Sequence, residues 1–160
     1  MDETVLTKKI ARANSKAKSN DIPLLQLLHR ASQQADALFA DAVADDSLTT
    51  SQFLILRALS TLGTVSQAHI SHETGIDRST TAGIVRRLVK QGRIKRKRNR
   101  GDARAYDVCL TDKGKHALRL ATQAATRMEN AASAATGQQK AGALKSQLRV
   151  FVKAMETKKA

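Results

Sequence analysis

Residues 66–110 limit the possible folds more than any other part of this sequence, because several cap and turn signals follow one another at short spacing. Ser66 can cap a short helix over residues 67–74, and Gly75 supplies the permissive backbone that a tight turn between helices needs. A second helix is expected over residues 78–91, with inward-facing residues Ile84, Val85, Leu88 and Val89. The segment therefore predicts two helices joined by a glycine turn.

After Gly92 the pattern changes from helical spacing to two short extended segments. The predicted strands cover residues 93–98 and 105–110, and the turn between them contains Asn99, Arg100, Gly101 and Asp102. A hairpin directly after two short helices predicts a wing beside a helix-turn-helix. The expected fold class is mainly α with a small β wing.

Amphipathic helices are predicted before this segment. The first covers residues 22–43, with Pro23 in its first turn and apolar residues at spacings of three and four. Another helix is expected over residues 52–62, where Thr50 or Ser51 can serve as the cap. Residues 1–20 are polar and basic, and we expect them to form a mobile arm.

Two further helices are predicted after the wing. Thr111 can cap a long alanine-rich helix that ends near residues 136–137. The final helix carries an apolar stripe of Leu144, Leu148, Phe151 and Met155. Neither the first nor the last helix can bury its stripe within so small a winged lobe, so we expect a homodimer.

The predicted elements divide the chain into four parts. We expect a basic arm in residues 1–20, a dimerisation helix in residues 21–48, a winged helix-turn-helix lobe in residues 49–112, and dimerisation helices in residues 113–160. A chain of 160 residues is long enough for one folded unit.

The charge of the chain favours a polyanionic partner. Lys and Arg number 28 against 14 Asp and Glu, which gives a formal net charge of +14. With three Phe, one Tyr and no Trp, the chain has few rings on which single-stranded bases could stack, so double-stranded DNA is preferred.

The sequence also predicts where the chain works. No apolar stretch is long enough to cross a bilayer, and no apolar run follows the acidic amino terminus, so we expect a cytoplasmic protein without a membrane partner. Cys109 is the only cysteine, which permits no internal disulfide and fits a reducing compartment.

Basic residues are concentrated between residues 86 and 104, where ten stand against one acid, Asp102. They are Arg86, Arg87, Lys90, Arg93, Lys95, Arg96, Lys97, Arg98, Arg100 and Arg104. The preceding helix start, residues 77–81, presents hydroxyls and a guanidinium that can reach base edges or phosphates in the major groove. The alternative is that Ser79 and Thr80 only cap the helix. The predicted DNA contacts are Ser66, Gln67, Asp77, Arg78, Ser79, Thr80, Thr81, Arg86, Lys95, Lys97, Arg98, Arg100, Asp102 and Arg104.

Several motifs in fixed order resemble the multiple-antibiotic-resistance regulator (MarR) family. They are the helix of residues 52–62, the helix-turn-helix of residues 66–81, Leu88-Val89-Lys90-Gln91-Gly92-Arg93-Ile94, Asp102-Ala103-Arg104, and Leu110-Thr111-Asp112-Lys113-Gly114. The resemblance covers almost everything after residue 21. Two departures are Gly83 inside the second short helix and the four consecutive basic residues 95–98, which predict high non-specific DNA affinity.

The resemblance implies a transcriptional repressor. Its first and last helices would build an intertwined homodimer, the helix after the glycine turn would read the major groove, and a wing arginine would enter the minor groove. Arg104 would be that arginine, or be held beside it by Asp102, with Arg100 at the tip. The two-fold axis then requires an inverted-repeat operator.

The resemblance also implies control by a ligand. Many members are released from DNA by a small anionic aromatic or phenolic compound bound between the dimer helices and the DNA-binding lobe, and the regulated operon would serve aromatic-compound catabolism or efflux. His29, Arg30 and Arg57 lie where that cleft is expected, and a carboxylate could bind there. The alternative is that they are solvated or paired with acids.

Other classes of function are less well supported by the residues. His69 and His72 share a helical face but lack a third metal ligand, so no metal or cofactor is expected. Cys109 could sense oxidants, although a buried strand cysteine is the favoured interpretation. No phosphate-binding glycine loop or set of nucleophile and base indicates an enzyme. The main alternative is an architectural DNA-binding protein without a ligand.

Overall fold

The computed structural model describes residues 22–43, 48–99 and 106–157. The chain divides into two units, residues 1–37 and 38–160. Helix α2 (Leu24–Ala42) begins in the first unit after Pro23, as the sequence predicts, and its last residues belong to the second unit. The predicted basic arm lies outside the described residues.

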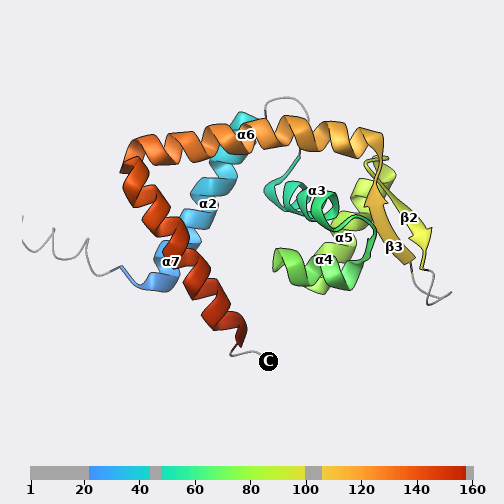
Figure 1. Cartoon of the computed structure of the whole chain (residues 1–160), viewed down its shortest axis with the longest axis horizontal. Coiled ribbons are helices and arrows are strands. Elements are labelled where there is room, and N and C mark those ends of the chain that lie inside the picture. The colour runs from blue at the N-terminus through green and yellow to red at the C-terminus, as the bar shows by residue number, and fades with distance from the viewer. Residues whose placement is uncertain (1–21, 44–47, 100–105, 158–160) are drawn as a thin grey trace, which may run out of the picture. The chain divides into compact units, whose positions relative to one another are not determined.

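The second unit combines helices with three short strands (Figure 1). Its elements after α2 are α3 (Thr50–Leu62), β1 (Val65–Ser66), α4 (Gln67–Thr74), α5 (Arg78–Lys90), β2 (Ile94–Arg98), β3 (Tyr106–Leu110), α6 (Asp112–Thr136) and α7 (Gln138–Thr157). The predicted fold class, mainly α with a small β wing, is confirmed.

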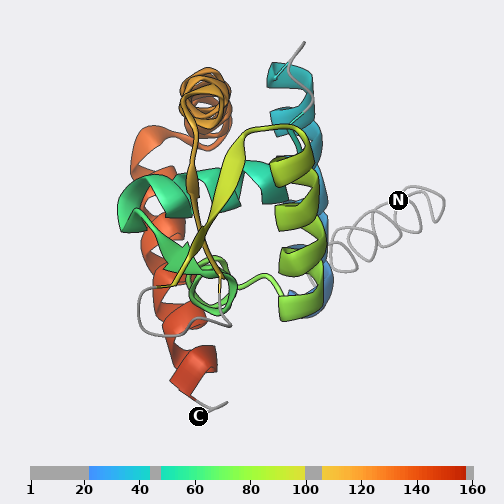
Figure 2. The same cartoon turned by 90° about the vertical axis from the view of Figure 1, so that its right-hand side faces the viewer.

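The sheet has three antiparallel strands in the order β1-β3-β2. Val65 of β1 pairs with Val108 of β3, and Ile94 of β2 pairs with Leu110. The prediction of two strands therefore missed β1. A strand of only two residues is too short to show the alternation of apolar and polar residues by which strands are predicted from sequence. Figure 2 shows the strands beside α5, to which β2 is connected by a tight turn.

Local hydrogen bonds define where the helices begin. Ser66 caps α4 as predicted, since its hydroxyl accepts the N–H of His69 at 3.2 Å. The cap of α3 is Thr49 rather than Thr50 or Ser51: the Thr49 hydroxyl accepts the N–H of Gln52, and the Gln52 side chain accepts the N–H of Thr49. This reciprocal pair is a capping box, which favours Thr49 over the following hydroxyl residues.

A core of large apolar side chains joins the end of α2 and helices α3 to α6 to the sheet. The rings of Phe39 and Phe53 pack at 5.1 Å between centroids. The fully or almost fully buried residues include Ile55, Leu56, Leu59, Ile70, Ile84, Val85, Leu88, Ile94 and Val108. Small residues of α6, Ala117, Ala121 and Ala124, complete this cluster, so α6 packs closely on the lobe.

The start of α6 is tied to the end of the α5–β2 turn. The backbone N–H of Thr111 donates to the carbonyl oxygen of Arg93 at 3.1 Å, and its hydroxyl lies 2.7 Å from the carbonyl oxygen of Gly92. The same hydroxyl accepts the N–H of Gly114. A Cβ on Gly114 would collide with the carbonyl group of Arg93, so only glycine allows this approach.

In the part of the chain that the structure describes, no helix combines the length and the apolar character needed to cross a membrane.

The close approach at Gly114 predicts a specific loss of stability. Gly114→Ala should lower the free energy of unfolding by about 1–3 kcal/mol, because an added methyl group must displace the backbone of Arg93. Urea unfolding followed by circular dichroism measures the change. Gly83→Ala is the matched control, because an added Cβ there meets open space within α5, and it should raise stability by up to about 1 kcal/mol. Equal effects of the two substitutions would contradict the packing argument.

Candidate nucleic-acid interface

Asp77 organises the start of α5. Its carboxylate accepts the backbone N–H of Thr80 at 2.9 Å and the hydroxyl of Ser79 at 2.7 Å. Hydrogen bonds from the Thr80 side chain, from the Thr80 backbone and from Ser79 hold the pKa of the Asp77 carboxyl well below its usual range. Asp77, and not Ser79 or Thr80, is therefore the cap of α5, and both hydroxyl residues are exposed at the helix start.

Thr81 differs from its neighbours. Its side chain is fully buried and its hydroxyl donates to the carbonyl oxygen of Ile76 at 3.3 Å. The position lies three and four residues before Ile84 and Val85, so it shares the inward face of α5. The predicted DNA contact by the Thr81 side chain is therefore corrected: this residue supports the turn from inside the lobe.

The exposed cations of α5 lie along one side of the helix. Arg78, Arg86 and Lys90 are exposed and are separated by multiples of four residues, which places them in one row. Arg87 is exposed beside this row. Lys90 and Arg87 were not among the predicted contacts, although the helical spacing of the basic residues could have identified them.

Strand β2 of the wing is basic on both faces. Lys95 and Lys97 share one face of β2, and Arg96 and Arg98 share the other, since side chains alternate along a strand. All four are exposed. Arg93, which belongs to the same basic run in the sequence, is 6% exposed and therefore lies in the lobe interior.

The other predicted contacts are positioned as follows. Ser66 and Gln67 lie partly buried at the start of α4, where the Ser66 hydroxyl acts as a helix cap. Arg100, Asp102 and Arg104 lie outside the described residues, and their roles stay predictions.

The predicted ligand residues are accessible. His29 and Arg30 are exposed on α2 in the first unit, and Arg57 is exposed on α3 in the second. Cys109 is buried in β3, as the favoured interpretation of that residue expected. Among the described residues, no three His, Cys, Asp or Glu side chains are grouped as a metal site would require.

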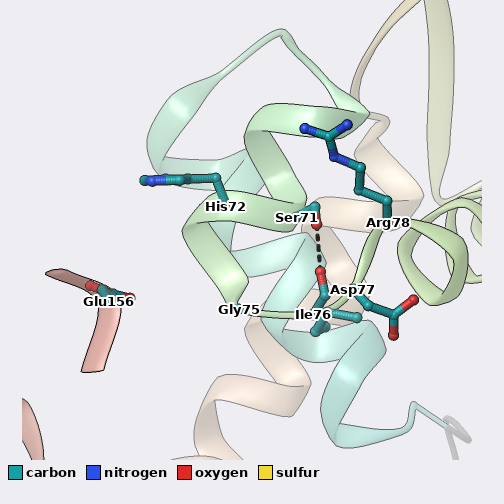
Figure 3. A pocket seen from close by; sticks show the side chains of 7 residues that line it. All are labelled: Ser71, His72, Gly75, Ile76, Asp77, Arg78 and Glu156. Atoms are coloured by element: carbon teal, nitrogen blue, oxygen red, sulfur yellow. Dashed lines mark hydrogen bonds between the residues drawn. The ribbon is translucent and has the colours of Figure 1, made fainter. Parts of the chain in front are cut away.

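A pocket of about 550 Å³ lies next to the turn between α4 and α5 (Figure 3). It is lined by Ser71, His72, Gly75, Ile76, Asp77, Arg78 and Glu156. The hydroxyl of Ser71 donates to the carbonyl oxygen of Ile76 at 2.6 Å, which holds the turn that forms one wall. None of the three predicted ligand residues lines this pocket, and its charged groups have both signs.

Two helices joined by a left-handed glycine turn and followed by a basic antiparallel hairpin define a winged helix-turn-helix protein. Residues 46–105 match the model of the MarR family. The HTH-type transcriptional repressor NicR of Pseudomonas putida is 38% identical over 88 residues, which make up 55% of this chain and 56% of NicR. The chain thus matches little more than half the length of that relative.

Solved structures extend the similarity beyond the lobe. The transcriptional repressor CouR, bound to a 23-mer DNA duplex, is 30% identical with a TM-score of 0.76, over 81% of this chain and 92% of CouR. BpsR of Bordetella bronchiseptica, whose DNA binding is regulated by 6-hydroxynicotinic acid, is 27% identical with a TM-score of 0.73, over 79% of this chain and 96% of BpsR. The chain belongs to the MarR family.

The exposure of α5 and β2 predicts two kinds of DNA contact. Arg78→Ala should weaken binding to a preferred duplex by about 1–3 kcal/mol and relax discrimination at one or two base pairs, because a base-edge contact is lost. Lys97→Ala should weaken binding to preferred and scrambled duplexes alike and reduce the salt slope by about one, because a phosphate contact is lost. Titrations at several salt concentrations measure both. Identical behaviour of the two variants would contradict the division between reading helix and wing.

Proposed function

We propose that the chain is a dimeric repressor that binds an inverted-repeat operator through α5 and the wing and is released by a small anionic aromatic ligand. The observation that carries the proposal is the row of exposed cations on α5 beside a strand with four exposed cations. A duplex presents regularly spaced phosphates to both elements when α5 enters the major groove. The likeness to CouR bound to DNA supports this mode.

Large apolar side chains that are exposed to solvent support the proposal of a dimer. On α7 the stripe of Leu144, Leu148, Phe151 and Met155 is exposed, with Leu148 at 40% and Phe151 at 36%. Further exposed leucines of α2 are Leu24, Leu25, Leu27 and Leu38. Large apolar residues at helical spacing are stabilised by burial against another helix. We infer that a second copy of the chain covers them, which gives the two-fold axis of the operator.

Control by a ligand is the second part of the proposal. The relative BpsR responds to 6-hydroxynicotinic acid, a small aromatic carboxylate. Arg57 has an exposed guanidinium, and no hydrogen bond or ion pair joins that group to another described residue. A carboxylate ligand can therefore bind it without displacing a protein partner. We keep His29 and Arg30 as the further candidate ligand residues.

The competing function is an architectural DNA-binding protein that needs no ligand. The formal charge of +14 and the four consecutive cations of β2 favour it, because both strengthen binding to DNA of any sequence. The hydroxyl residues and the capping carboxylate at the start of α5 favour the repressor instead, because such groups can distinguish base edges.

The dimer proposal predicts that the α7 stripe is needed for two-fold binding. Phe151→Asp should give monomers in light scattering and should lose footprint protection of paired half-sites about 10 bp apart. Val150→Asp is the control, because Val150 is exposed on the same helix outside the stripe, and this variant should remain dimeric. A folded Phe151→Asp monomer that protects both half-sites as the wild type does would contradict the proposal that the chain binds DNA as a dimer.

The ligand proposal predicts stabilisation by aromatic carboxylates or phenols. A ligand at about a hundredfold excess over its Kd should stabilise the folded chain by about 2.7 kcal/mol and weaken operator binding. Thermal-shift screening can start with 6-hydroxynicotinic acid. Arg57→Ala should abolish the shift, whereas His72→Ala, which alters the pocket beside α5, should retain it. Retention in Arg57→Ala with loss in His72→Ala would move the ligand to that pocket, and no response to any compound would favour the architectural protein.

A further inference from the structure

Asp107 is an acidic residue in the middle of the basic hairpin. It lies in β3 and pairs across the sheet with two residues: Lys97 of β2 on one side and Ser66 of β1 on the other. Ser66 is also the cap of α4. Asp107 therefore lies between the start of the helix-turn-helix and the cationic strand of the wing.

The carboxylate of Asp107 has a defined partner. The side-chain amide of Asn99 donates to both of its oxygens, at 3.1 Å to Oδ1 and 3.0 Å to Oδ2. Asn99 follows the last residue of β2 and lies two residues beyond Lys97, so the contact runs diagonally across the two strands. It restrains the end of β2 beyond the last strand pair, Arg98 with Tyr106.

Lys97 can bind a phosphate although Asp107 lies opposite it in the sheet. It is exposed, and among the ion pairs of the described residues none shorter than 4 Å joins it to Asp107. Residues directly opposite in an antiparallel pair have Cβ atoms about 4.5–5.5 Å apart, so a phosphate that binds Lys97 comes close to the carboxylate. The attraction of the lysine and the repulsion by Asp107 then act on the same phosphate.

The pair of Lys97 and Asp107 can favour one DNA sequence over others through the position of the phosphates. On an arbitrary duplex the wing can slide among many phosphate positions, and the repulsion weakens most of them. On the correct sequence, α5 sets the register, and the restrained end of β2 presents Lys97 to one phosphate from a fixed direction. The repulsion between the Asp107 carboxylate and the bound phosphate then lowers the affinity less than it does on random DNA.

We propose that Asp107 is a specificity-determining residue of the DNA interface, which restrains the affinity of the basic wing for DNA of any sequence and positions the end of β2 through Asn99. This inference rests on the proposed function. It differs from a purely structural role, in which Asp107 would stabilise the hairpin and change binding to all duplexes by the same factor.

The test compares two substitutions that each remove one negative charge. Asp107→Asn keeps the size of the side chain. Asp112→Asn is the matched control, because Asp112 is an exposed acid at the start of α6 that pairs with Lys115 at 3.0 Å. Binding is measured for a duplex selected by the wild type from a random pool and for a scrambled duplex, at several salt concentrations. Thermal melting of each variant checks folding.

Asp107→Asn should raise affinity for the scrambled duplex about threefold and lower the ratio of selected to scrambled affinity about fivefold, at about 0.1 M salt. Asp112→Asn should leave that ratio within about twofold. Asn99→Ala keeps the charge of Asp107, so it should weaken binding to the selected duplex about threefold without strengthening binding to the scrambled one.

The outcomes separate this inference from the proposed function. Equal ratios for Asp107→Asn and Asp112→Asn, in a wild type that discriminates between the duplexes, would overturn the role of Asp107 alone. A wild type that selects no preferred duplex would overturn the proposed repressor, and the specificity role would fall with it.

Discussion

The contact between the start of α6 and the backbone of Arg93 is the constraint on which the arrangement of the second unit depends. The Thr111 hydroxyl lies within hydrogen-bonding distance of the carbonyl oxygens of Gly92 and Arg93, and it also accepts the N–H of Gly114. Polar backbone groups at the end of α5 and at the start of α6 are thus satisfied by one side chain. Because Gly114 has no Cβ, α6 can approach the turn until backbone meets backbone. The orientation of the long helix and that of the recognition helix α5 are therefore linked.

This link couples α5 to the long helix α6 within residues 38–160. Small residues of α6, Ala117 and Ala121 among them, pack on the same core that holds the inward face of α5. Close-packed interiors transmit displacement instead of absorbing it. If α6 and α7 contribute to a dimer, the spacing of the two recognition helices is set through these contacts, and a ligand that favours another placement of α6 competes with operator geometry.

The sequence predicted the elements whose signals are local. In the structure, as predicted, Ser66 caps the start of α4, Gly75 forms the turn at its end, and Thr111 caps the start of α6. Signals that depend on other parts of the chain were missed. Strand β1 forms only because β3 lies beside Val65 and Ser66, and Arg93 is buried although its sequence neighbours are exposed. The contact role expected of Thr81 failed because the inward face of α5 includes that position, as the spacing to Ile84 would have indicated.

The sequence indicated the exposed cations of the candidate site, and it placed Asp77 among the expected contacts, but it did not indicate that Asp77 caps α5 or that Asp107 holds Asn99. A run of basic residues identifies a DNA-binding surface from sequence alone, since each cation contributes to phosphate attraction almost regardless of its surroundings. Asp77 and Asp107 are informative only through geometry: one caps α5 and holds Ser79, and the other holds Asn99. On a chain with a net charge of +14, further cations would strengthen binding to all DNA equally. Discrimination between sequences therefore requires base-edge contacts, which we expect of Arg78, together with groups that orient or oppose the phosphate-binding cations, as we propose for Asp107.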